Sequence, residues 1–238
     1  MATTIVSVEQ PQKRSRPFGR IIDPPPLVNG DRLTRTEFER RYRAMPPVKR
    51  AELIEGIVFM PSPVRFQHAE PHGYLMTWLG TYRAATAGVR LLDNATVRLD
   101  ADNEVQPDAL LRIEPAAGGH SRVTDDDYLE GAPELIGEVA LSSASYDLRD
   151  KLNVYRRTGV QEYIVWQVLD ERIDWVELHE GAYVSRLPDE NGVIHSQVFP
   201  GLSLSVEKML DGDLAGVLAE LSLGLGTPEH QALIERLV

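Results

Sequence analysis

The chain has 238 residues, of which 42% are hydrophobic and 26% are charged, and it contains no cysteine. This is the composition of a globular protein with a sizeable core, and the lack of cysteine excludes disulfides, thiolate nucleophiles and zinc–thiolate sites. A net charge of −11 argues against a broadly basic nucleic-acid-binding surface, so any contact with DNA is expected to be local or weak.

The N-terminal residues 1–30 are rich in proline and show no sustained periodicity, which predicts a flexible extension. This segment contains a basic cluster formed by Lys13, Arg14, Arg16 and Arg20. Such a cluster could bind nucleic acid, but a solvated tail is the favoured interpretation. No apolar run is long enough to cross a bilayer, and the N-terminus lacks the apolar core of a secretion signal. We therefore expect a soluble, cytoplasmic protein.

A main domain is expected over residues 31–205. A capping box formed by Thr34 and Glu37 predicts the start of a short helix. The stretch "AELIEGIVFMP" then predicts two short strands joined by a turn at Glu55-Gly56. From Pro71 to Ala87 apolar residues recur at helical spacing, which predicts a long helix with the proline in its first turn.

The second half of the domain has the pattern of a mixed sheet. Strands are predicted at residues 89–92, 95–100 and 105–113. An apolar strand at 134–141, a helix at about 146–158 and a strand at 162–169 predict a parallel crossover. The runs "RIDWVEL" and "AYVSRL" predict a closing antiparallel meander. Because its strands are expected to be exposed, the protein could form a homodimer. Two short helices are predicted to form a C-terminal helical extension over residues 206–238.

Two acidic residues stand in predicted core strands. Glu138 lies in "ELIGEVAL", where an unpaired carboxylate requires a metal ion, a cationic partner or a raised pKa, and a structural salt bridge is an alternative explanation. Asp108 follows a proline in "VQPDALLRI". If the two strands are neighbours, the carboxylates repel one another unless a divalent cation or a shared proton intervenes.

A lysine shares the apolar face of the helix that follows Glu138. Leu148, Lys151, Leu152 and Tyr155 fall on one helical face. The ammonium of Lys151 then either extends to the surface or reaches Glu138, and the pattern alone leaves both interpretations open.

The order of "ELIEG", "QPD", "GAPELIGEV" and "YDLRDKLNVYRRTGVQEYIVW" resembles the Uma2 family (DUF820), over roughly residues 48–205. The resemblance implies an α/β (α+β) fold of the restriction-endonuclease-like PD-(D/E)XK type, with a mixed central β-sheet flanked by helices. The acidic residues of that fold would be Asp108 and Glu138. Two positions after Glu138, where the general pattern has lysine, this chain has Ala140, and the resemblance places the lysine at Lys151 instead.

The resemblance also covers Glu52 and His72, and it shows a second departure at Gln167. Glu52 matches an upstream acidic residue that would bind metal or orient water, although pairing with an arginine explains it equally well. His72 matches a family histidine. His68 lies four residues before it, but the intervening Pro71 and the missing third ligand argue against a zinc pair. Gln167 stands where relatives have an aspartate.

The expected function is that of a magnesium- or manganese-dependent endonuclease that hydrolyses DNA phosphodiester bonds. Asp108 and Glu138 would bind the metal, and Lys151 would assist the attacking water. A non-catalytic binding or assembly protein on the same scaffold is the alternative. A two-carboxylate glycosidase would need an aromatic sugar cleft, and Trp166 and Trp175 fall instead in predicted core strands.

Overall fold

The computed structural model describes residues 23–46, 50–60, 66–141 and 147–237, without the side chains of residues 147 and 148. Most of the predicted extension at 1–30, including all four of its basic residues, lies outside the described residues. So do Tyr146, at the predicted start of the helix, and the side chain of Leu148 in the predicted helical stripe.

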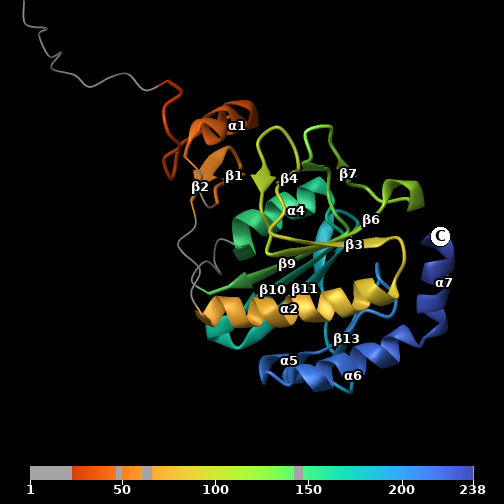
Figure 1. Ribbon diagram of the computed structural model, residues 1–238. Coiled ribbons are helices and arrows are strands. Elements are labelled where there is room, and N and C mark those ends of the chain that lie inside the picture. Colours follow the sequence, from red (N-terminus) through yellow and green to blue (C-terminus); the bar gives the residue numbers. More distant parts are fainter. Residues whose placement is uncertain (1–22, 47–49, 61–65, 142–146, 238) are drawn as a thin grey trace, which may run out of the picture.

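The described residues form a mixed α+β fold (Figure 1). The strands are β1 (Glu52–Ile54), β2 (Ile57–Phe59), β3 (Val89–Asp93), β4 (Val97–Arg98), β5 (Glu104–Val105), β6 (Ala109–Ile113), β7 (Arg122–Val123), β8 (Leu129–Glu130), β9 (Leu135–Ala140), β10 (Glu162–Gln167), β11 (Arg172–His179), β12 (Ala182–Ser185), β13 (Val193–His195) and β14 (Ser203–Ser205). The α-helices are α1 (Arg35–Ala44), α2 (Phe66–Ala85), α4 (Leu152–Thr158), α5 (Val206–Leu210), α6 (Leu214–Leu225) and α7 (Pro228–Leu237), and a π-helical turn at Asp147–Lys151 precedes α4.

The central sheet has the strand order β12-β11-β10-β9-β6-β3. Strands β9 and β10 are parallel and are joined through α4, which confirms the predicted crossover. The meander β10-β11-β12 is antiparallel, also as predicted. Helices α2 and α4 lie on opposite sides of the central strands (Figure 1).

A second sheet, with the order β2-β1-β5-β4-β8-β7, lies beside the central one. Its β1-β2 hairpin has the predicted turn, with positive φ at both Glu55 and Gly56. The prediction of one continuous strand over residues 105–113 is wrong. Pro107 has no N–H for a ladder and restricts the residue before it, so the chain leaves β5 in the second sheet and enters β6 in the central sheet just after Asp108.

Helix α2 begins earlier than predicted, at Phe66, so Pro71 lies inside the helix rather than in its first turn. The proline removes one main-chain donor, a loss that the packing of Trp78 and Tyr82 in the core can offset.

In α1, Thr34 accepts from the backbone N–H of Glu37 at 3.4 Å, while the carboxylate of Glu37 binds arginines, so only half of the predicted capping box forms. No helix among the described residues is both long and apolar enough to cross a membrane.

The C-terminal part contains more structure than predicted. Three α-helices, α5 to α7, follow residue 205 within the described residues, where two were expected, and the β13-β14 hairpin was not predicted because its strands have only three residues each. Leu221 of α6 and Leu233 of α7 join the core cluster that lines one face of the central sheet. These helices therefore share the main core.

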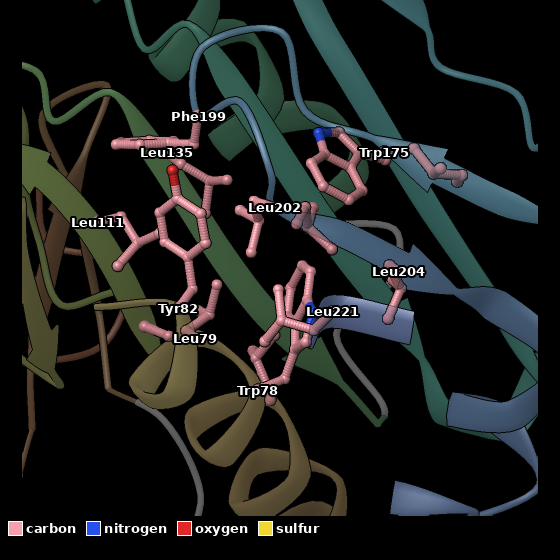
Figure 2. Close-up of a cluster of buried hydrophobic side chains, with 14 of the residues drawn as sticks. Trp78, Leu79, Tyr82, Leu111, Leu135, Trp175, Phe199, Leu202, Leu204 and Leu221 are labelled. Carbon is pink, nitrogen blue, oxygen red and sulfur yellow. The ribbon is translucent and has the colours of Figure 1, made fainter. Parts of the chain in front are cut away.

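The two faces of the central sheet carry separate core clusters. On the α2 face, Trp78 and Tyr82 point toward the strands and pack among leucines and other aromatic side chains (Figure 2). The rings of Trp78 and Trp175 pack in a T-shaped arrangement with their centroids 5.9 Å apart. On the α4 face, Val154 and Tyr155 pack against strands of both sheets.

Strand β9 alternates between these two clusters. Leu135 and Val139 belong to the α2 face, and Ile136 and Ala140 belong to the α4 face. Because side chains alternate along a strand, Glu138 shares the α4 face. The fold therefore directs this carboxylate toward the helix that carries Lys151.

Candidate active site

The structure brings together the four residues that the sequence singled out. Glu52, Asp108, Glu138 and Lys151 come from β1, the turn before β6, β9 and the turn before α4, and each is buried. We refer to these four residues with Arg50 as the candidate site. Its parts come from four segments of the chain, so it exists only when both sheets and the crossover have formed.

Lys151 lies between two carboxylates. Its Nζ donates to Oε1 of Glu138 at 2.7 Å and lies 3.1 Å from Oε1 of Glu52. The residue is only 2% exposed, so the ammonium lies inside the protein and does not extend to the surface. One helical turn later, the hydroxyl of Tyr155 donates to the same oxygen of Glu138 at 3.1 Å. The crossover thus holds this carboxylate with two donors.

Asp108 lies across from Glu138 because of the strand register. Ala109 pairs with Gly137 in the antiparallel β6-β9 ladder, so the next position along brings Asp108 opposite Glu138. The N–H of Val139 donates to Oδ2 of Asp108 at 2.9 Å, and the N–H of Asp108 donates to Oε2 of Glu138 at 3.4 Å. Two buried carboxylates are therefore fixed on neighbouring strands.

The break at Pro107 supplies further hydrogen bonds. The N–H of Gln106 donates to Oε1 of Glu52 at 2.7 Å, and the carbonyl of Gln106 accepts from Nη2 of Arg50. Glu52 and Glu138 thus accept the amides on either side of the proline. This interruption of the strand positions the acidic residues of the candidate site.

Arg50 and His68 bind Asp108, and sequence reasoning gave neither of them a role at this site. Nη1 of Arg50 donates to Oδ1 of Asp108 at 3.1 Å, and Nε2 of His68 lies 3.2 Å from Oδ2. The signal for Arg50 was its place two residues before Glu52 in extended chain, which puts both on one side of the strand. The signal for His68 was its position on one helical face with His72.

The charges around Asp108 control its ionisation. Burial alone would raise the pKa of this carboxyl, but the hydrogen bond from His68, the positive charge of Arg50 and the N–H of Val139 outweigh burial and hold the pKa well below its usual range. Burial opposes the charged form of Arg50, yet the negative charges of Glu52, Glu138 and Asp108 raise its pKa. Asp108 is therefore an ionised acceptor near neutral pH.

His72 has different partners from His68. Its Nε2 lies 3.0 Å from the backbone oxygen of Asp108 and 3.2 Å from Oδ1 of Asp93. The two histidine rings, 6.0 Å apart, thus each contact a different part of Asp108. Together they connect the first turns of α2 to the start of β6.

The donor set of the candidate site suits a hard divalent cation. Its three carboxylates offer oxygen ligands, whereas the two permanent cations are Arg50 and Lys151. One negative charge is thus left over if His68 is neutral. No group of three or more acidic or histidine side chains surrounds one point among the described residues. Mg²⁺ is nevertheless often bound by only two carboxylates, with water or substrate as its other ligands. Asp108 and Glu138 fit such a site.

The sequence profile of the Uma2 family, described as "Putative restriction endonuclease", matches residues 35–207. This range covers well over half of the chain and includes all of the candidate site. The chain belongs to the Uma2 family. Uma2 membership confirms the resemblance seen in the sequence motifs. A search of curated proteins gave no match.

The fold agrees with that assignment. The Uma2 chain superimposes on the crystal structure of "a putative nuclease belonging to DUF820" from Anabaena variabilis with a TM-score of 0.56. The two share 10% sequence identity over 72% of this chain and 96% of the other. The predicted restriction-endonuclease-like fold, with a mixed sheet flanked by helices, is thereby confirmed.

One departure from the expected Uma2 pattern lies beside the candidate site. Gln167 ends β10, pairs with Ala140 in the parallel ladder and donates its amide to Asp174. An aspartate at this position would face the carboxylate of Asp174, and like charges repel one another. Glutamine therefore suits its neighbour in this chain.

Proposed function

We propose that this Uma2 protein is an endonuclease that hydrolyses DNA phosphodiester bonds with Mg²⁺ or Mn²⁺ held by Asp108 and Glu138. The observation that carries the proposal is the buried lysine whose ammonium lies 2.7 Å from Glu138, while Asp108 lies opposite that carboxylate on the next strand. Two carboxylates on neighbouring strands, with a lysine beside them from the following helical turn, supply groups that metal-assisted phosphodiester hydrolysis can use.

Each side chain would have a separate role. When bound, the metal would polarise a phosphoryl oxygen and lower the pKa of a water ligand. Lys151 would hold the attacking water and stabilise the negative charge that develops on the phosphate. Glu52, 3.1 Å from the ammonium, would orient Lys151, and Tyr155 would fix the carboxylate of Glu138.

The overall charge limits how DNA would be bound. A chain with a net charge of −11 repels a polyanion at long range, so the contact has to depend on local cations. Arg50 is a permanent cation within the candidate site that is partly exposed. Binding is therefore expected to be weak without a divalent cation.

The test is cleavage of supercoiled plasmid by purified protein with Mg²⁺ or Mn²⁺, with EDTA as the first control. Glu138→Gln should abolish metal-dependent nicking. Glu134→Gln is the matched control, because Glu134 is also buried next to β9 but binds main-chain groups outside the candidate site. Nicking that persists in Glu138→Gln would come from another site or a contaminant and would contradict the proposal.

A second candidate function is a non-catalytic binding or assembly protein on the same fold. It is favoured by the ion pairs themselves, because Arg50 and Lys151 already neutralise two of the three carboxylates. Calorimetric titration with Mn²⁺ separates the two functions. Metal binding that disappears in Asp108→Asn supports the nuclease, whereas no binding by the folded wild-type chain supports the alternative.

A further inference from the structure

We propose that Arg50 has two alternative partners: it binds Asp108 while the metal is absent, and it binds a phosphate of the nucleic acid once a divalent cation has taken that carboxylate. The inference rests on the proposed function and adds a substrate-binding residue to it.

Arg50 occupies an oxygen that the metal would need. Its Nη1 donates to Oδ1 of Asp108 at 3.1 Å, and its Nη2 lies 3.8 Å from Oε1 of Glu52. A divalent cation bound at Asp108 would lie beside this guanidinium, and two positive charges at such separations repel one another strongly in a buried site. Metal and arginine therefore compete for the same carboxylate.

The present contacts leave two nitrogens beside Asp108 unsatisfied. Within the part of the chain that the structure describes, Nε of Arg50 and Nδ1 of His68 are buried and have no hydrogen-bond partner. Buried polar groups without partners are rare because each loses its hydration without compensation. The arrangement is thus incomplete on the side where Arg50 and His68 meet Asp108, and a ligand with oxygen acceptors would complete it.

Arg50 is also better placed than Lys151 to change partners. The side chain of Arg50 is 19% exposed, whereas that of Lys151 is 3% exposed and is held between two carboxylates. A guanidinium presents a planar fork of donors that matches the oxygens of phosphate. The cation at the solvent side is therefore the one suited to meet the nucleic acid.

Arg50→Gln tests the inference by two measurements that should change in opposite directions. Calorimetry with Mn²⁺ alone should show binding about fivefold tighter than in the wild type, because a competing cation is gone. Fluorescence anisotropy of a labelled DNA duplex in Ca²⁺ should show binding about tenfold weaker, and the slope of log K against log salt should fall by about 0.9 because one phosphate contact is lost.

Two further variants make the result specific. Arg50→Lys keeps the competing charge and loses the fork, so its Mn²⁺ affinity should stay near that of the wild type while DNA binding weakens by about threefold. Arg172→Gln removes an exposed arginine that pairs with Asp174, and it should change neither affinity.

The outcomes separate this inference from the proposed function. If wild-type protein binds Mn²⁺ and Asp108→Asn does not, but Arg50→Gln binds metal and DNA as the wild type does, Arg50 does not exchange partners. Weaker binding of both metal and DNA in folded Arg50→Gln would show a purely structural arginine and also overturns the inference. Absence of Mn²⁺ binding in every folded variant would overturn the proposed function together with it.

Discussion

Two buried glutamates lie four residues apart, Glu134 just before β9 and Glu138 within it, and their closest donors differ in kind. Glu134, just before the strand, accepts backbone N–H groups from Ile113 at 2.7 Å and from His120 at 2.9 Å. Glu138 accepts from the side chains of Lys151 and Tyr155. The sequence presents both as acidic residues of the same "ELIGE" segment.

The difference lies in what can be exchanged. Main-chain donors are fixed by the fold, so Glu134 connects β9 to the end of β6 and has a structural role. Side-chain donors can also act on a bound ligand, which is the role proposed for Lys151 beside Glu138. Side-chain donors therefore distinguish Glu138 from Glu134, although both carboxylates are buried.

The largest effect is expected at Lys151. Lys151→Met removes the ammonium that would stabilise the transition state, and cleavage should fall by roughly 10²–10³-fold. Single-turnover cleavage by folded protein measures this loss. Lys208→Met, which changes a half-buried lysine of α5 outside the candidate site, is the control and should cleave at the wild-type rate. Equal rates for both variants would contradict the role of Lys151.

The next effect concerns the free energy of unfolding. Lys151→Met should cost about 3–5 kcal/mol, because it leaves Glu52 and Glu138 buried without their shared cation. Adding Glu138→Gln should recover roughly 1–3 kcal/mol, since the two side chains are directly coupled. Urea unfolding of both single variants and the double variant measures the coupling. Additive losses would show that the ion pair contributes nothing.

A smaller change in stability is expected at Glu134, just before β9. Glu134→Gln replaces one acceptor oxygen with an amide that faces backbone N–H groups, and this should cost about 1–3 kcal/mol of stability. Cleavage per folded molecule should stay unchanged. Urea unfolding together with the plasmid assay distinguishes the two effects. A loss of cleavage with unchanged stability would reverse the comparison between the glutamates.

A further effect is a pH dependence at a third buried acid, Glu104 of β5. Burial first, and then the charge of and hydrogen bond with Glu39, raise the pKa of Glu104 from 4.5 to about 8, the opposite of the shift at Asp108. The folded state then holds a proton that the unfolded state releases. This contribution to stability is present below about pH 4.5 and is lost as the pH rises through about 8.

Glu104→Gln should therefore flatten the decrease of the unfolding free energy between pH 5 and pH 8, a slope that one proton limits to about 1.4 kcal/mol per pH unit. Urea unfolding at several pH values in this window provides the measurement. If the variant retains the full slope of the wild type, the titrating group lies elsewhere.

Much of the fold could be predicted because its signals are local. The turn at Glu55-Gly56, the meander and the crossover all follow from short patterns in the chain. The break at Pro107 was visible as a residue, but its consequence depends on which sheet each half of the segment joins, and that is a long-range property. The β13-β14 hairpin has strands too short to give a periodic signal.

The candidate site divides in the same way. Glu138, Asp108 and Lys151 could be singled out because polar residues at apolar positions are conspicuous, and their roles stay predictions. Arg50 gave no such signal, because it lies outside any apolar run and its contact with Asp108 joins residues 58 positions apart. The sequence shows where an unusual residue type lies, but it does not show which distant residue that side chain contacts.

The proline inside α2 bears on how the molecule could move. Pro71 cannot donate a hydrogen bond to the carbonyl one turn earlier, at Gln67, so the first turn of the helix lacks one of the bonds that tie it to the rest. His68 lies in that turn and contacts Asp108. The first turn is therefore tied to the remainder of α2 by one hydrogen bond fewer, and a metal bound by Asp108 would act on this turn directly through His68.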